Sequence, residues 1–160
     1  RTIMGHFDLW LANGGRITRK QLAALPKAEA ESLTAFVRSR PISFRTSHAG
    51  EDILFVHAGV NPAAEDCQEN MLWIREKFFA GYHGSTLVVV GHTPTQMLRR
   101  GGAAVPLFLP NNIIACDTGA YLPGGRISCV DAAHYLRLRA GGHALTAGER
   151  ASCYMQAERG

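Results

Sequence analysis

Two apolar runs decide the fold: residues 53–59 read Ile-Leu-Phe-Val-His-Ala-Gly, and residues 87–94 read Leu-Val-Val-Val-Gly-His-Thr-Pro. Four consecutive apolar residues bounded by polar or turn residues are typical of a strand that is buried on both faces. Such strands occur in sheets that helices cover on both sides. The two runs therefore predict an α/β protein.

The segments before the first run add two helices and a strand to this prediction. Residues 1–14 have the pattern of a helix end, with a stop at residues 13–15. Residues 27–40 carry apolar side chains at helical spacing and predict an amphipathic helix. Residues 42–45 alternate between apolar and polar, which predicts a strand joined to the first apolar run by a hairpin at residues 47–52.

The segments after the first run predict short helices and further strands. Residues 72–79 can form two short helical turns. Three more strands are expected at residues 113–116, 127–130 and 134–139, paired antiparallel with one another. We expect residues 1–139 to form one unit and residues 140–160 to be a Gly-rich, weakly structured tail.

Composition and charge exclude several classes of protein. With 46% hydrophobic and 19% charged residues, the 160-residue chain has a globular rather than a disordered composition. Its net charge is +4, but the basic residues are scattered and do not alternate with aromatic ones, so we expect no nucleic-acid partner. The apolar segments are too often interrupted to span a membrane, so we expect no membrane partner.

The four cysteines suggest a reducing compartment. Cys67, Cys116, Cys129 and Cys153 match neither a CxxC pair nor zinc-knuckle spacing. We therefore expect free thiols and a cytoplasmic location.

A histidine lies where each stretch of apolar residues ends: His57 follows Val56 directly, and His92 follows Val90 after one glycine. In open α/β sheets, ligands bind in the crevice beyond the strand ends, so both imidazoles are expected at one site. Gly59 and Gly91 would let a ligand approach the backbone there, and imidazole favours Zn, Mn or Fe over Mg. Two hydrogen-bonded packing histidines fit the same pattern, so both interpretations stay open.

Arg75 lies between the two runs, in a charged turn with apolar surroundings. A guanidinium presents a rigid fork of donors that matches phosphate oxygens bidentately. The pattern also fits an ordinary cluster of charges on a solvated helix face.

Four motifs, taken in order, carry a family resemblance: residues 55–62 (Phe-Val-His-Ala-Gly-Val-Asn-Pro), 72–76 (Leu-Trp-Ile-Arg-Glu), 90–94 (Val-Gly-His-Thr-Pro) and 117–120 (Asp-Thr-Gly-Ala). Together they resemble the bacterial-type Ser/Thr protein phosphatases of the calcineurin-like metallophosphoesterase superfamily. Residues 10–15, Trp-Leu-Ala-Asn-Gly-Gly, are also similar to a segment of that family. The resemblance covers residues 8–131 and corresponds to the C-terminal half of the family domain.

The resemblance implies a four-layer β-sandwich flanked by helices, with the N-terminal half missing from this chain. It also implies two divalent metal ions, with Mn expected and Fe or Zn as alternatives. A water activated by these ions would hydrolyse phosphate monoesters. The substrate would be a phosphoprotein, through phosphoserine or phosphothreonine, or a small phosphorylated molecule. His57 and His92 match metal ligands, and Arg75 matches a phosphate-binding arginine. Asp117 matches a residue near the rim that supports the ligands or only the fold. No residue of this chain is assigned as the catalytic acid.

The family's other ligand motifs, Asp-x-His, Gly-Asp-x-x-Asp-x-Gly and Gly-Asn-His-Asp/Glu, do not occur in the sequence. Two neutral imidazoles cannot compensate the charge of two divalent cations. We therefore expect the 160 residues to be an incomplete fragment with little or no activity alone. Two alternatives remain: a diadenosine tetraphosphate hydrolase, which residues 91–94 disfavour, and a non-catalytic remnant that acts as a binding module.

Overall fold

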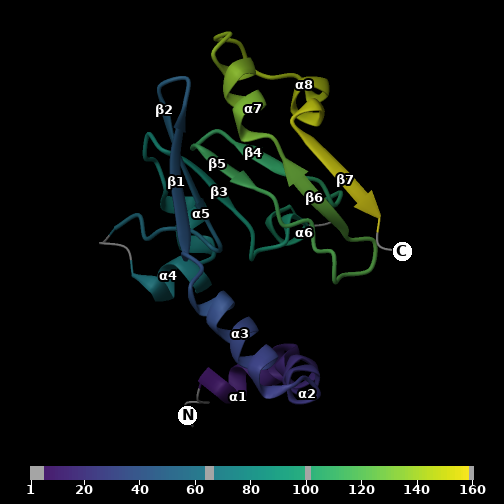
Figure 1. Cartoon of the computed structure of the whole chain (residues 1–160). Coiled ribbons are helices and arrows are strands. Elements are labelled where there is room, and N and C mark those ends of the chain that lie inside the picture. Colours follow the sequence, from purple (N-terminus) through teal and green to yellow (C-terminus); the bar gives the residue numbers. More distant parts are fainter. Residues whose placement is uncertain (1–5, 64–66, 100–101, 159–160) are drawn as a thin grey trace. The chain divides into compact units, whose positions relative to one another are not determined.

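The computed structural model describes residues 6–63, 67–99 and 102–158, and it divides the chain into two compact units, Arg1–Pro41 and Ile42–Gly160 (Figure 1). This division differs from the single unit that we expected over residues 1–139. His57 and His92, the two histidines at the ends of the apolar stretches, both lie in the second unit.

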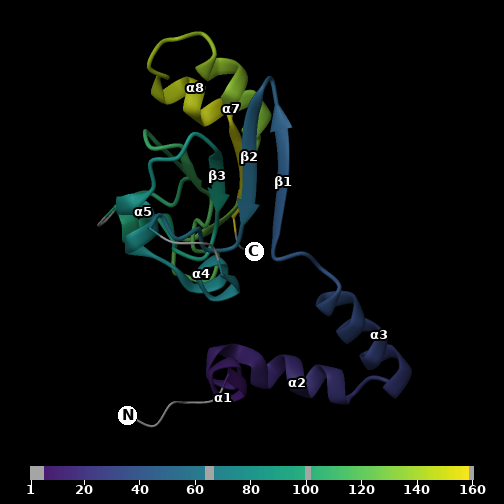
Figure 2. The ribbon, with the colours of Figure 1, turned by 90° about the vertical axis from the view of Figure 1, so that its left-hand side faces the viewer.

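The first unit is helical. It contains α1 (His6–Trp10), a π-helical turn η1 (Leu11–Gly15), α2 (Arg16–Ala23) and α3 (Lys27–Arg38). The expected stop at residues 13–15 is a kink rather than an end: Gly14 has a φ of 96°, and the chain then resumes as α2. The helix expected at residues 27–40 is confirmed as α3, which follows α2 after a short turn (Figure 2).

The second unit contains a mixed five-stranded sheet. Its strands are β1 (Ser43–His48), β2 (Glu51–Val56), β3 (Leu87–Val90), β4 (Leu107–Leu109) and β5 (Ile113–Ala115), in the order β1-β2-β3-β5-β4. The three central strands β2, β3 and β5 are parallel, whereas β1 and β4 pair antiparallel at the two edges. The α/β class and the two apolar strands are thus confirmed.

The hairpin between β1 and β2 is also confirmed. Its turn residues Ala49 and Gly50 have φ values of 53° and 81°. Two consecutive positive φ values are the conformation of a type I′ turn, whose twist matches that of the flanking strands.

Successive residues of the central strands face opposite layers of the core. One layer holds Leu54, Val88 and Ile113 together with Phe78. The other holds Ile53, Val89 and Ile114 with side chains of the C-terminal segment. Phe78 belongs to α5 (Glu76–Gly81), which follows α4 (Gln68–Trp73), and α6 (Thr95–Leu98) follows β3. Because both faces are covered, the central strands are apolar where they cross the core, at residues 53–56, 87–90 and 113–115.

The C-terminal segment differs from the sequence prediction. It comprises β6 (Arg126–Val130), α7 (Ala132–Arg139), α8 (Ala147–Ser152) and β7 (Tyr154–Glu158). The strand expected at residues 134–139 is wrong, because these residues belong to α7. The Asp131 carboxylate caps that helix by accepting a hydrogen bond from the His134 amide at 2.7 Å. Tyr135 and Leu136 are buried and form the core-facing side of the helix.

The strand pairing predicted for this segment is also wrong. β6 pairs antiparallel with β7, whereas β5 runs parallel to β3. Nor are residues 140–158 weakly structured: they contain α8 and β7, and Cys153 between them is fully buried. The burial of Cys153 against the sheet explains why this Gly-containing segment is ordered.

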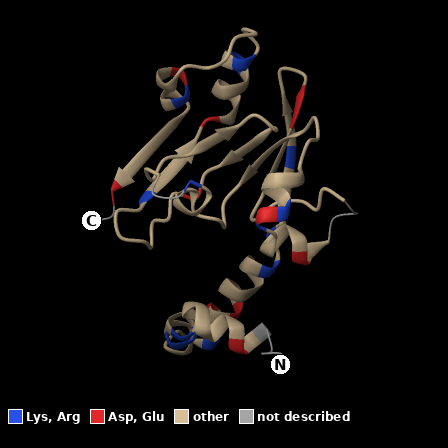
Figure 3. Cartoon of the chain, turned by 180° about the vertical axis from the view of Figure 1, so that it is seen from behind, with Lys and Arg blue, Asp and Glu red and all other residues tan. Residues whose placement is uncertain are grey.

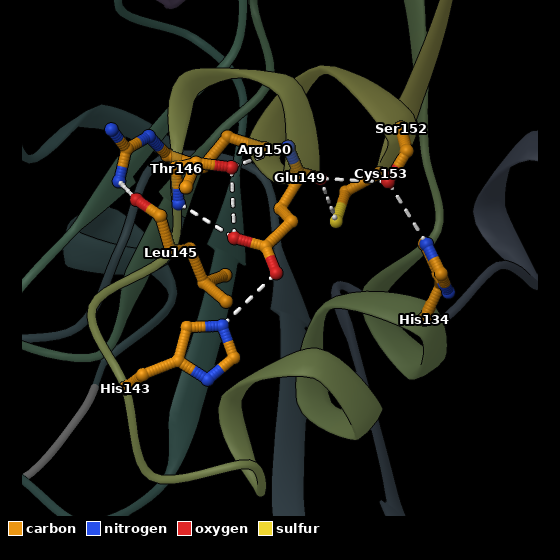
Figure 4. Close-up of polar contacts among 8 residues, drawn as sticks. All are labelled: His134, His143, Leu145, Thr146, Glu149, Arg150, Ser152 and Cys153. Carbon is orange, nitrogen blue, oxygen red and sulfur yellow. Dashed lines mark hydrogen bonds and ion pairs between the residues drawn. The ribbon is translucent and has the colours of Figure 1, made fainter.

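The start of α8 is a capping box (Figure 4). The Thr146 hydroxyl accepts the Glu149 amide at 3.2 Å, and the Glu149 carboxylate accepts the Thr146 amide at 2.7 Å. Glu149 also contacts His143 at 3.0 Å. The hydrogen bond from the Thr146 backbone, followed by that from His143, lowers the pKa of Glu149 from 4.5 to about 2, while Glu149 raises the pKa of His143.

None of the helices in the described ranges is long and apolar enough to cross a membrane.

The capping box predicts a pH-dependent contribution to stability. Glu149→Gln removes the charge, so we expect a lower Tm than that of the wild type between pH 5 and 6. The difference should shrink as the pH falls from 4.5 towards 2, because a carboxylate with a depressed pKa loses its contribution on protonation. It should also shrink as the pH rises through the raised pKa of His143.

Thermal unfolding followed by circular dichroism from pH 2 to 8 measures this difference. Glu76→Gln, which makes the same charge change at an exposed carboxylate, is the matched control. A Tm difference for Glu149→Gln that is equal at pH 2 and at pH 5 contradicts the prediction.

Candidate functional site

The pairing of β2 with β3 brings His57 and His92 together. The two strands run parallel with Val56 opposite Val90, so the residues that follow emerge at the same edge of the sheet. The Gly91 amide donates to the His57 carbonyl at 2.9 Å, which joins the two strand ends. His57 Nε2 lies 3.0 Å from His92 Nδ1. The expected convergence of the two imidazoles is therefore observed.

Arg75 reaches the same place from the break between α4 and α5. The sequence pattern suggested a helical turn here, but Ile74 and Arg75 have non-helical backbones, and the chain changes direction. The Arg75 Nη1 group donates to the His92 carbonyl at 3.1 Å and to the Thr93 hydroxyl at 3.0 Å. The other guanidinium donors, on Nε and Nη2, make no hydrogen bond to any residue that the structure describes.

His92 has an unusual backbone, with a φ of 64°. This left-handed conformation is uncommon for a residue other than glycine and costs about 1 kcal/mol or more. The adjacent turn is tight, because the Thr93 amide donates to the Gly91 carbonyl at 2.6 Å. The hydrogen bond from Arg75 to the His92 carbonyl holds this conformation and aims the imidazole at His57.

Asp117 follows β5 and lies near the two histidines. One carboxylate oxygen accepts the Gly119 amide at 2.8 Å, and its backbone carbonyl accepts the Thr95 amide at 2.8 Å. Asp117 therefore organises its own turn and fixes the start of α6. Burial lowers the pKa of both histidines, and the charge of Asp117 opposes this lowering, so Asp117 also acts on the site through space.

Gly59 has a packing role that the sequence did not predict. Gly59 has a φ of 151°, and a Cβ there would lie 2.6 Å from the Phe78 ring, so packing of Phe78 requires this glycine. A Cβ at Gly91 would meet its nearest atom, the His57 carbonyl oxygen, at 3.7 Å, which is ordinary contact. Close approach of a ligand is thus not needed to explain the glycine at position 59.

Burial and the charge of Arg75 lower the pKa of both imidazoles, which favours the neutral form. Burial lowers the pKa of His57, and Arg75 adds to this, while Asp117 opposes it. Burial, Arg75 and His57 lower the pKa of His92, and Asp117 and the Trp73 backbone oppose them. Neutral imidazole is the form that binds a metal ion, and it is also the form in which one ring can donate to the other.

Two residues of the site were not predicted from the sequence. Trp73 is half exposed and meets the His92 ring edge-on, with ring centroids 5.7 Å apart. Thr93 is buried and accepts from Arg75. Thr93 directly follows His92 and Trp73 is two residues before Arg75, so their closeness in the sequence to these two residues is the signal that could have identified them.

The histidine pair fits one part of a metal centre. Two nitrogen ligands of a tetrahedral zinc ion, each about 2.0–2.1 Å from it, lie about 3.3 Å apart, close to the 3.0 Å observed between Nε2 and Nδ1. His92 Nε2 is buried and makes no well-formed hydrogen bond to a described residue, although the Trp73 backbone is close enough to raise the pKa of the ring. Within residues 6–63, 67–99 and 102–158, no group of three or more His, Cys, Asp and Glu side chains is arranged to hold an ion.

The electrostatics of the pair predict the order in which the histidines titrate. His57 and His92 should titrate below 6.5, and His143 above it. Arg75→Met should raise the pKa of His57 and His92, because Arg75 lowers both, and it should leave His143 unchanged. Long-range ¹H–¹⁵N spectra of the imidazoles recorded from pH 4 to 9 measure all three, and a lower pKa for His57 in the variant contradicts the assigned effect of Arg75.

No family model matches this chain, and no curated protein matches it. The assignment of the histidines, Arg75 and Asp117 to a chemistry therefore depends on the sequence motifs and on the geometry described above.

Proposed function

We propose that this chain provides the histidine and arginine side of a metal-dependent phosphatase site that acts on phosphate monoesters, including phosphoserine and phosphothreonine. The observation that carries the proposal is the convergence of His57 and His92 at 3.0 Å with Arg75 anchored on the His92 carbonyl. An imidazole pair and a guanidinium with free donors form a surface for a divalent cation and a phosphate.

In this proposal His57 and His92 hold a divalent ion through the nitrogens that face each other. Such an ion supplies Lewis-acid chemistry, lowering the pKa of a bound water and neutralising charge on a phosphate. The low pKa of both rings keeps their lone pairs available at neutral pH. Mn is the expected metal, with Zn and Fe as alternatives, because imidazole suits all three.

Arg75 has two tasks that use different donors. Nη1 fixes the backbone of His92. Nε and Nη2 remain for the substrate, and two donors of one guanidinium suit two oxygens of a phosphate. The same side chain thereby sets the distance between the phosphate and the imidazole pair.

The proposed site needs carboxylates from residues outside this set. Two imidazoles are neutral, and Asp117 already accepts the Gly119 amide. An acid that protonates the leaving oxygen is also required for fast ester hydrolysis. We therefore propose that the surface described here is one side of the complete site.

Metal binding can be tested through Trp73, whose ring lies 5.7 Å from that of His92. In a Trp10→Phe background Trp73 is the remaining tryptophan, and we expect Mn²⁺ or Co²⁺ to quench its fluorescence in a saturable way. His57→Gln or His92→Gln should weaken the apparent affinity at least about tenfold, since even indirect partners of metal ligands contribute about 10–100-fold.

His83→Gln is the matched control, because His83 is exposed and belongs to neither strand end. Zn²⁺, which does not quench by paramagnetism, should compete with Co²⁺ for the site. Quenching that survives in both His57→Gln and His92→Gln rules out the proposed ligands.

Phosphate binding tests the role of Arg75. In the presence of Mn²⁺, we expect inorganic phosphate to show enhanced ³¹P relaxation that depends on the protein. Arg75→Lys should weaken phosphate binding about tenfold or more, because a charge-assisted hydrogen bond contributes about 1.5–3 kcal/mol. Arg126→Lys, at an exposed ion pair, should have no effect.

Hydrolysis separates the proposed function from its alternatives. We expect little turnover of p-nitrophenyl phosphate by this chain with Mn²⁺, because the carboxylates and the acid are missing from the set described above. If the chain turns over p-nitrophenyl phosphate rapidly and His92→Ala abolishes this activity, the proposal that the ligand set is incomplete is wrong. Binding of diadenosine tetraphosphate in preference to a phosphoserine peptide favours the nucleotide hydrolase.

A further inference from the structure

A pocket of about 350 Å³ lies between the end of β4, the end of α7 and the segment that leads into α8. This volume falls within the roughly 300–1,000 Å³ of small-molecule sites. All of the residues that line the pocket belong to the second unit, and His57, Arg75 and His92 are not among them. The pocket is therefore separate from the candidate functional site.

One part of the lining is apolar and aromatic. The rings of Phe108, from β4, and Tyr135, from α7, have centroids 4.9 Å apart. Tyr135 is buried in the second core layer, and Phe108 and Leu145 are partly buried against that layer. Because the core holds these side chains in place, they offer a fixed surface on which a further aromatic ring can pack.

The other part of the lining is basic. It contains Arg139, His143 and Arg150, and none of the described residues that line the pocket is Asp or Glu. Figure 3 shows basic residues on both α7 and α8, the two helices at the top of the view. Arg139 forms an ion pair with Glu51, and His143 contacts Glu149 at 3.0 Å. Arg150 forms no ion pair with a carboxylate of the described residues, so one positive charge at the pocket is uncompensated.

The guanidinium of Arg150 is held in a way that leaves two of its nitrogens available. Nη1 donates to the Leu145 carbonyl (Figure 4). Nε and Nη2 make no hydrogen bond to a residue that the structure describes. These two nitrogens form one edge of the guanidinium, and their parallel N–H bonds match the two oxygens of a carboxylate. Leu145 thus joins the apolar part of the pocket to the cation.

We propose that this pocket binds a small aromatic carboxylic acid, whose carboxylate accepts from Nε and Nη2 of Arg150 and whose ring packs against Phe108 and Leu145. One uncompensated positive charge matches the single negative charge of a carboxylate, whereas a phosphate monoester carries about 1.5–2 charges at pH 7. Because none of these residues belongs to the candidate functional site, this proposal and the proposed phosphatase function stand or fall separately.

Binding of phenylacetate to the full chain, followed in ¹H–¹⁵N spectra at pH 6 without added metal, tests the proposal. The pKa of His143 is raised, chiefly by its hydrogen bond to Glu149, so at this pH the imidazole is charged and balances that carboxylate. We expect saturable shifts of the amides of residues 108–109, 143–145 and 150, with a Kd of about 1 mM or less. Phenylethanol, which has the ring without the charge, and acetate, which has the charge without the ring, should each bind at least about tenfold more weakly.

Arg150→Lys keeps the positive charge but removes the pair of parallel donors, so phenylacetate should bind about tenfold more weakly. Arg137→Lys is the matched control, because Arg137 is an exposed arginine of α7 that does not line the pocket, and it should leave binding unchanged. Both arginines are exposed, so neither change disturbs the core, and circular dichroism of each variant establishes that the fold is retained.

Any of the following outcomes overturns the proposal. If phenylacetate causes no saturable shift at these amides up to about 10 mM, the pocket does not bind an aromatic acid. If phenylethanol binds as tightly as phenylacetate, Arg150 does not recognise the carboxylate, and if acetate binds as tightly, the apolar lining does not recognise the ring. If Arg150→Lys binds phenylacetate like the wild type, the carboxylate lies elsewhere.

Discussion

The parallel pairing of β2 with β3 is the constraint on which the candidate site depends. Two strands that pair in parallel end at the same edge, and the register of Val56 with Val90 leaves the next residues side by side. The hydrogen bond from Gly91 to the His57 carbonyl continues the pairing past the last strand residue. The imidazoles therefore meet because of backbone geometry, before any contact between their side chains is considered.

Arg75 is the second determinant of the site, because it binds the strained backbone of His92 and thereby influences where the His92 imidazole points. His92 has a left-handed backbone that carries an energetic cost, and the guanidinium offsets part of it by binding the carbonyl. The same charge disfavours protonation of both rings. One side chain thus supports the backbone conformation of His92, adds to burial in lowering the pKa of both rings, and has donors left for an anion.

Much of the sheet and of the site could be predicted from the sequence. The runs before His57 and His92 are apolar at every position, which leaves little choice other than a strand with both faces covered. The helix at α3 is bounded by prolines, and its periodicity is clear. By contrast, residues 134–139 alternate well enough to pass for a strand, and only the cap at Asp131 together with the burial of Leu136 decides for a helix.

The sequence by itself determined the α/β class, the two strand ends and the residue types that follow them, because these depend on local patterns of apolar and polar side chains. The tertiary structure decided what depends on long-range pairing: that β6 pairs with β7, that Cys153 is buried, and that His57 lies 3.0 Å from His92. It also decided that position 59 requires glycine, because a Cβ there would collide with the Phe78 ring. The local pattern predicts that two strand ends share one edge of a sheet, but the partners and distances of contacts between residues far apart in the chain leave no such pattern.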